Sequence, residues 1–369
     1  MTIPRLTPTP AGPAQPGMRF SVDAWDVSYG SALNLTEEDL PASVIRVDTD
    51  VEVPADQWAP IAAPGDVAHP SAVLFVDGVR RVDARVWIDD PTDSTDSSHG
   101  AAGAASASMA VCASYGAGVV CCCGDERTGR QAHLLAAEIR RGLFTTASHA
   151  LDIPTSCGTY RVRHTPASDT TPLMLTLSNA LQVALAEIEV ITAVAARHAL
   201  ADDPVHGGAV PCGPDGAEDD LLVIDGPLKG RAHLPRALGF IKTHRAGYLP
   251  AALNAVVAAL IQGQRTPVFL MGNSWDRYAW YLRLPSSPDL PGAPWAGVVR
   301  CEAAPDLSPA QVTALANLSQ NVLVRYASIA YKDSRAPQNL VPIAGLEDTL
   351  RHRLGDPRVL YRALSSAAR

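Results

Sequence analysis

The chain has 369 residues, of which 47% are hydrophobic and 18% are charged. This composition supplies a large core and excludes a chain that is disordered throughout. The formal net charge of −8 argues against a protein that coats nucleic acid by bulk positive charge. It leaves open a nucleic-acid enzyme with a local basic groove. Among the 30 basic residues only Lys229, Lys242 and Lys332 are lysines.

Residues 1–20 are rich in proline and are expected to form a disordered tail, followed by one domain over 21–369. Small and polar residues predict a flexible loop at about 91–107. The N-terminal segment lacks the apolar region of a signal peptide, and no run approaches the ~18 apolar residues of a membrane span. The seven cysteines contain no C-x-x-C pair, which disfavours a zinc or redox motif. We therefore expect a cytoplasmic protein without a membrane partner.

The first predicted element is a β-hairpin with Asp77-Gly78 at its turn, because Asp-Gly supplies the positive φ that tight hairpins need. Its strands are residues 72–77 and 79–89. A third strand is expected over 108–123, where the three consecutive cysteines act as small hydrophobic residues. A long helix follows over 172–200, since Pro172 suits its first turn and apolar residues recur at helical spacing.

The second half of the chain continues as a mixture of strands and helices. Strands are predicted over 221–228, 237–244, 280–284 and 296–302, and helices over 249–264 and 309–330. Three strands, a helix, a strand and then mixed elements predict an α/β fold with a central sheet flanked by helices.

Two predicted strands run into Asp-Gly, in LFVDG at Asp77 and in LVIDG at Asp225. A single Asp-Gly after a strand is more often ordinary turn chemistry. Here, however, an acidic helix lies between the two, with Glu187 and Glu189 on either side of the apolar Ile188. Helical phase alone does not choose between these glutamates. Acids on the first strand, the helix and the fourth strand are the order expected of an RNase H-like metal site.

Carboxylate oxygens are the hard ligands that Mg²⁺ and Mn²⁺ prefer. Two such ions about 4 Å apart can activate water and stabilise the leaving oxygen of a phosphodiester. The series of acids therefore makes metal-dependent hydrolysis of a phosphodiester a hypothesis, which the spacing alone does not decide.

The motifs resemble those of the NurA nuclease family. LLVIDGPL followed by GFIKTH resembles the family's strand end and its G-x-x-K segment, and LFVDG resembles its first acidic strand. YAWYLRL, GVVRCE and RAPQNLVPIAGLEDTLRHRLGD look like the C-terminal part of bacterial members. The resemblance extends from about Phe75 to the C-terminus, with the loop at 91–107 outside it.

The resemblance implies an RNase H-like mixed sheet flanked by helices, with a C-terminal extension. It also implies a Mn²⁺- or Mg²⁺-dependent deoxyribonuclease with a two-metal site, forming a homodimer that encloses DNA. The implied partner is a hexameric HerA-type ATPase, in DNA end processing for repair or in defence against phage.

Positions carried over from the family give a predicted site. Asp77 and Asp225 are the metal ligands, together with Glu189 or, as second choice, Glu187. Lys242 is expected near the scissile phosphate, where a cation stabilises developing charge. Expected DNA-binding residues are Arg80, Arg81, His244, Arg245, Tyr248 and Gln338. A solvated surface is the competing interpretation for His244 and Arg245, and a rim aromatic is the competing interpretation for Tyr248.

The sequence departs from the family near its C-terminus, where PQNLVPIAGLE lacks the histidine that members often carry. Gln338 and Asn339 could offer polar contacts instead, and His352 is interpreted as a surface residue. This departure motivates an alternative, a non-catalytic DNA-end or ATPase-binding module with a degenerate nuclease fold. A metal-dependent phosphatase acting on a small molecule is a third, weaker hypothesis.

Overall fold

The computed structural model describes residues 20–22, 46–89, 107–123, 131–202, 220–242, 248–272, 275–285, 295, 297–329, 332–333 and 336–368. The tail predicted over 1–20 and the loop predicted over 91–107 lie outside these residues, apart from Phe20 and Ala107.

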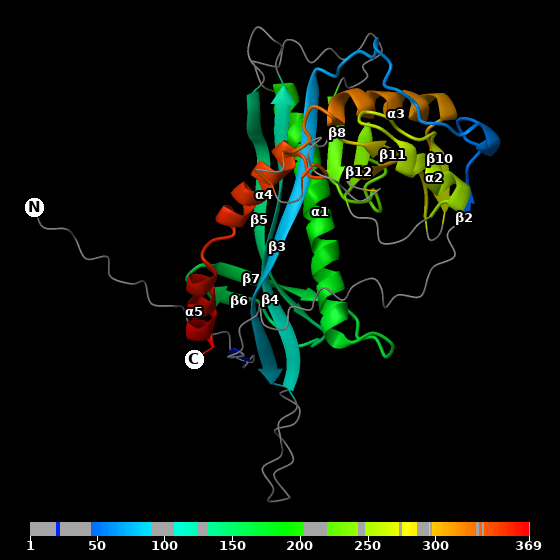
Figure 1. Ribbon diagram of the computed structural model, residues 1–369. Helices are drawn as coiled ribbons and strands as arrows, with labels where there is room; N and C mark the ends of the chain where they lie inside the picture. The colour runs from blue at the N-terminus through cyan, green and yellow to red at the C-terminus, as the bar shows by residue number, and fades with distance from the viewer. Residues whose placement is uncertain are drawn as a thin grey trace, which may run out of the picture.

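A mixed sheet of 12 strands runs through the molecule (Figure 1). Its order is β2-β10-β11-β12-β9-β8-β3-β4-β5-β7-β6, and β1 pairs with β3. The strands are β1 (Phe20–Val22), β2 (Arg46–Asp48), β3 (Ala72–Asp89), β4 (Ala107–Cys123), β5 (Gln131–Thr145), β6 (Ile153–Thr155), β7 (Gly158–His164), β8 (Asp220–Asp225), β9 (Ala237–Ile241), β10 (Phe269–Gly272), β11 (Asp276–Arg283) and β12 (Val298–Ala303).

Helices cover both faces of this sheet, and they are α1 (Leu173–Asp202), α2 (Ala251–Ala259), α3 (Pro309–Leu323), α4 (Val341–Arg353) and α5 (Pro357–Ala367). Leu74 of β3 shares an apolar cluster with α1, whereas its neighbour Phe75 shares one with α3. Because successive strand side chains point to opposite faces, α1 and α3 lie on opposite sides of the sheet. The side chains of β11 alternate in the same way between α2 and α3, so α2 lies on the same side of the sheet as α1. Those of β5 alternate between α5 and α1, so α5 lies on the same side as α3.

The centre of the sheet is the five-strand segment β5-β4-β3-β8-β9. β4 is antiparallel to both β3 and β5, while β3, β8 and β9 run parallel to one another. In the β3–β8 ladder Val76 pairs with Ile224. The next residues, Asp77 within β3 and Asp225 at the end of β8, therefore lie side by side on two neighbouring parallel strands.

The hairpin predicted at Asp77-Gly78 is wrong. β3 continues through both residues as one strand of 18 residues, and Gly78 pairs with Ala117 of β4. The glycine serves a close approach instead of a turn. A Cβ at this position would lie 2.6 Å from Oε1 of Glu189 and 2.7 Å from Cδ1 of Leu185, both on α1. Glycine thus lets the helix pack directly on the strand.

The α/β class predicted from the sequence is confirmed, as are the strands that became β4, β8, β9, β11 and β12 and the long helix α1. Two predicted helices end earlier: α2 at Ala259 and α3 at Leu323. The prediction missed β5, whose sequence QAHLLAAEIRRGLFT is rich in alanine, leucine and arginine. These residues favour helices, and pairing with β4 overrides that preference.

The long helix α1 also has the length and apolar composition of a membrane-spanning helix over Leu173–Leu200. One of its faces is buried against the sheet, where Leu181, Leu185 and Ile188 pack on β4 and β5. The core helix of a soluble protein has the same composition. The predicted cytoplasmic location stays a prediction.

Candidate metal centre

Three carboxylates converge on the face of the sheet that α4 covers. One oxygen from each of Asp77, Asp225 and Glu347 lies within 4.8 Å of the others. The three residues come from β3, β8 and α4, which are far apart in the sequence. Asp77 and Glu347 are only 7% and 6% exposed, and Asp225 is half-buried. We call this group the carboxylate cluster.

Local folding explains how the carboxylate cluster forms. Asp77 and Asp225 follow paired residues of parallel strands, so their side chains lie side by side. Helix α4 lies across them because Leu346 and Leu350 pack on Val79 of β3. Glu347 comes directly after Leu346 and is brought down to the sheet by the same packing.

Lys242 completes the site from the end of β9. Its Nζ atom donates to Oδ2 of Asp225 at 2.6 Å and to Oδ1 of Asn339 at 3.0 Å. It also lies 3.9 Å from Oε1 of Glu347. Asn339 is fully buried and donates in turn to Oδ2 of Asp333 at 2.6 Å. The ammonium group is therefore held by three side chains from three parts of the chain.

The electrostatics of the carboxylate cluster favour a bound cation. Burial raises the pKa of Asp77 well above its usual value, and the negative charges of Asp225 and Glu347 raise it further. Lys242 and the backbone N–H of Gly78 oppose this shift in pKa but do not cancel it. Among the described ion pairs, Lys242 and Arg351 are the cations on these three carboxylates, so ionisation of all three leaves one more acid than base. A hard divalent cation suits this set of oxygen donors.

Glu189, the predicted third ligand, lies on the other face of the sheet. Its Oε1 atom approaches Gly78, whose side-chain direction is opposite to that of Asp77. It forms a buried ion pair with Arg231, which also donates to the carbonyl of Pro227 at 2.9 Å. Burial raises the pKa of Glu189 to about 7, although Arg231 lowers it. The structure does not bring Glu189 into the carboxylate cluster, and its role as a ligand stays a prediction.

Glu187, the second choice, points away from the carboxylate cluster. Its carboxylate lies 3.4 Å from Arg163 of β7, and about half of its side chain is exposed. Such a pair on the surface is typical of a solvated helix face.

The arginines predicted to bind DNA on β3 are engaged within the protein. Arg80 donates to the carbonyl and hydroxyl oxygens of Ser178 on α1, both at 3.4 Å. Its burial lowers the pKa of the guanidinium. Arg81 donates to Asp83 at 3.0 Å and to the carbonyl of Gly355 at 2.9 Å. These contacts join β3 to α1 and to the C-terminal helices.

The remaining predicted DNA contacts are His244, Arg245, Gln338 and Tyr248. His244 and Arg245 lie outside the described residues. Gln338 donates its side-chain amide to the carbonyls of Lys242 and Val298, each at 3.2 Å, and so helps to position Lys242. The guanidinium of Arg300 lies 4.9 Å from the centre of the Tyr248 ring, a cation–π contact.

Sequence reasoning missed Glu347, although it is the last residue of PQNLVPIAGLE. The resemblance implied a histidine in that segment and no acid. A signal was present, because Glu347 follows directly on an apolar stripe formed by Ile343, Leu346 and Leu350. An acid beside the buried face of a helix is uncommon unless it has a partner or a function.

Comparisons with known proteins assign no family. No protein-family model matches the chain, and no curated protein matches it. The function proposed for the chain is therefore based on the geometry of the site and on the motifs that resemble the NurA family.

Proposed function

We propose that the chain is a divalent-metal-dependent deoxyribonuclease with an RNase H-like core. The observation that supports this most strongly is the carboxylate cluster with Lys242 beside it. Buried carboxylates are costly unless they are paired or bind a metal, and the three acids outnumber the two cations of the described ion pairs, Lys242 and Arg351. We infer that the carboxylate cluster, and not Glu189, provides the main metal ligands.

The strand topology supports the RNase H-like part of the proposal. In chain order β3, β4 and β5 form an antiparallel meander, and β8 and β9 then extend the sheet in parallel from the other side of β3. Helix α1 lies in the chain between β5 and β8. This is the arrangement expected of an RNase H-like core, with acids on its first and fourth strands.

Each residue has a role in this proposal. Asp77, Asp225 and Glu347 would hold Mn²⁺ or Mg²⁺, which supplies Lewis-acid stabilisation of phosphate charge and activates water. Lys242 would contact the scissile phosphate and stabilise negative charge as it develops. Asn339 and Gln338 orient Lys242 through its ammonium group and its backbone carbonyl.

Substrate and partners follow from the resemblance. DNA is the proposed substrate, and a homodimer working with a hexameric HerA-type ATPase in the cytoplasm is the proposed assembly. The role would be DNA end processing, in repair or in defence against phage.

One observation favours the alternative, a non-catalytic DNA-end or ATPase-binding module. Lys242 is ion-paired to Asp225 at 2.6 Å, and Arg351 is paired to Glu347 at 3.0 Å. Protein cations thus neutralise two of the three acids. This alternative predicts partner binding without metal-dependent cleavage.

The test is digestion of end-labelled linear DNA by the full chain with Mn²⁺, with and without the ATPase. Asp77→Asn and Asp225→Asn should each lower the rate on the order of 100-fold or more, because each removes a charged metal ligand. Asp348→Asn is the matched control, since that acid is next to Glu347 but is 82% exposed. Wild-type rates in both folded site variants would contradict the proposal, and DNA binding without cleavage by the wild type would favour the alternative.

A further inference from the structure

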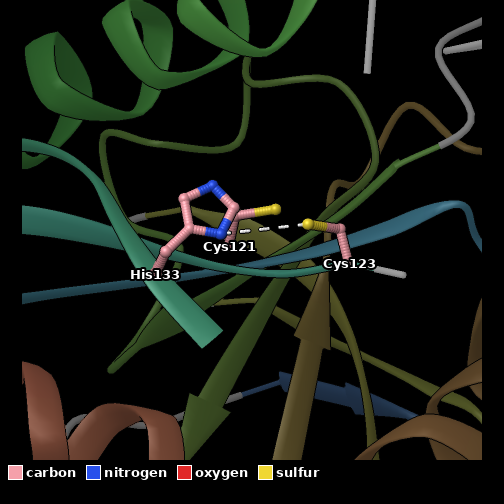
Figure 2. Close-up of side chains that lie close together, drawn as sticks. All are labelled: Cys121, Cys123 and His133. Atoms are coloured by element: carbon pink, nitrogen blue, oxygen red, sulfur yellow. Dashed lines mark hydrogen bonds between the residues drawn. The ribbon is translucent and has the colours of Figure 1, made fainter. Parts of the chain in front are cut away.

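A second group of potential metal ligands lies at the end of the β4–β5 hairpin. Cys121 and Cys123 project from the same face of β4, and His133 lies opposite Cys121 on β5. Figure 2 shows the three side chains turned toward one another. We propose that Cys121, Cys123 and His133 form a zinc site, which we call the thiol–imidazole cluster.

The distances suit a zinc ion after a small contraction. One donor atom from each residue lies within 4.8 Å of the others, and Sγ of Cys123 is 3.9 Å from Nδ1 of His133. Zn–S and Zn–N bonds of roughly 2.3 and 2.1 Å place neighbouring donors of a tetrahedral site about 3.5 Å apart. The side chains therefore need to move inward by about an ångström or less. Water would occupy the fourth position.

The position of these residues in the strands explains the convergence. Residues i and i+2 of a strand share one face, and the residue paired with one of them across an antiparallel ladder lies on that face too. Cysteine and histidine spaced in this way offer three ligands without a C-x-x-C motif. The sequence prediction disfavoured zinc because it considered spacing along the chain and not pairing between strands.

The surroundings favour a site of zero net charge. Cys121 is fully buried and Cys123 is 6% exposed, in an apolar cluster that includes Leu74 and Leu222. When Zn²⁺ binds, the two thiols release two protons to solvent, and two thiolates with a neutral imidazole balance the charge of the ion. A neutral site avoids the cost of an unpaired charge in this apolar environment.

The thiol–imidazole cluster is separate from the carboxylate cluster. Cys121 pairs with Leu74 of β3, three residues before Asp77, and its side chain lies with Leu74 in the apolar cluster on the α1 face. Asp77 points to the opposite face, under α4. Ligand chemistry separates the two clusters as well, because thiolate and imidazole favour zinc whereas carboxylates favour magnesium or manganese.

Zinc at this position would join β4 to β5 beside a bulge. The β4–β5 register shifts between Val119 and Val120, which leaves the ladder irregular just before Cys121. A metal bound to both strands would stabilise the pairing beyond this point, and its binding free energy would add to the folding free energy.

The test uses the full chain, stripped with a chelator, loaded with Zn²⁺ alone and desalted before the bound metal is measured. We expect one zinc per chain in the wild type, and loss of that zinc in Cys123→Ser and His133→Ala. Cys112→Ala is the matched control, because it removes a buried thiol from β4 that belongs to a different apolar cluster. Asp77→Asn should keep the zinc, which distinguishes this site from the carboxylate cluster.

Loading with Co²⁺ gives a second, independent measurement. The wild type and the Asp77→Asn variant should show the thiolate-to-cobalt absorption band, and His133→Ala should weaken it. His133 is partly exposed, so its variant is expected to fold even if Cys123→Ser does not. The proposal is overturned if the wild type retains no zinc, or if His133→Ala retains the full amount of zinc and the same band.

Discussion

Two charged groups lie back to back on the two faces of β3. Under α4, the carboxylate cluster combines three acids with Lys242. Under α1, Glu189 is paired with Arg231 in a buried contact. Arg351 also pairs with Glu347, so the described ion pairs give the first group three acids and two bases, whereas the second group has one acid and one base. Burial is similar on both faces, so burial alone does not distinguish a functional acid from a structural one.

Under the proposed function, this difference separates the acids that would bind metal from the acid that holds the fold. A balanced buried pair contributes to a specific packing arrangement, and breaking it is costly. An unbalanced group of buried acids reduces stability by mutual repulsion, and such an arrangement is typical of sites that bind a cation. Variants of the two groups should therefore differ in whether activity or stability suffers.

The largest expected effect is on DNA cleavage, and it separates Lys242 of the first group from Arg231 of the second. Lys242→Gln should reduce DNA cleavage about 100-fold or more, because it removes a cation positioned to stabilise developing charge. Arg231→Gln should leave the rate of cleavage much closer to wild type while lowering stability. Cleavage rates under single-turnover conditions and urea unfolding of both variants make this comparison. Equal rates for Lys242→Gln and wild type would remove Lys242 from the proposed mechanism.

Lys242→Arg tests whether the positive charge at this position is enough for cleavage. Arginine keeps the charge but cannot reproduce a compact ammonium that bonds Asp225 and Asn339 together. We expect partial activity, between that of the wild type and that of Lys242→Gln.

The second prediction concerns the stability of the balanced pair. Glu189→Ala should lower the free energy of unfolding by about 3 kcal/mol, because Arg231 is left buried without its partner. Glu347→Gln, measured without metal, should leave stability unchanged or raise it, since it relieves repulsion on Asp77. Denaturant unfolding in the presence of a chelator tests both. A large loss of stability in Glu347→Gln alone would reverse the roles we assign.

A third prediction follows from adding metal. Mn²⁺ at 100 times its dissociation constant should stabilise the wild type by about 2.7 kcal/mol, provided that the unfolded chain does not bind it. The gain should disappear in Asp77→Asn, which removes a charged ligand, and should persist in Glu189→Gln. Thermal unfolding with and without Mn²⁺ measures it. A gain that survives in Asp77→Asn would place the ion elsewhere.

The smallest effect is expected on the surface. Glu187 and Arg163 are 3.4 Å apart, with about half and a third of their side chains exposed. Glu187→Gln should change the free energy of unfolding by less than about 0.5 kcal/mol and should leave cleavage unchanged. The same unfolding and cleavage measurements check it, and a lost activity would restore Glu187 as a candidate ligand.

The two Asp-Gly pairs show which features of the structure the sequence alone could predict and which it could not. Asp225-Gly226 ends β8, and Gly226 has a positive φ of 114°. Asp77-Gly78 has the same letters, yet it lies inside a continuous strand. The strand continues at Gly78 because β4 pairs with it there, and α1 packs so closely on Gly78 that a side chain would not fit. The local sequence identified both aspartates as candidate site residues, but contacts between distant segments determined the backbone conformation at each of them.

Glu347 and His133 illustrate the same limit for sites. Both are brought to their clusters by tertiary packing: Glu347 by the contact of α4 with β3, and His133 by the register of β5 with β4. No motif of fixed spacing includes either residue. Asp77 and Asp225 were predictable as candidates because each follows an apolar run of a strand, whereas a carboxylate from a distant helix was not predictable from spacing.

The most direct test compares Glu347→Gln with Glu189→Gln in Mn²⁺-dependent cleavage of end-labelled DNA. Both substitutions are isosteric and remove one negative charge, but they act on opposite faces of β3. We expect that Glu347→Gln loses cleavage on the order of 100-fold while Glu189→Gln, if folded, retains most of it. Retained cleavage in Glu347→Gln together with its loss in folded Glu189→Gln would contradict the assignment of the metal centre to Asp77, Asp225 and Glu347.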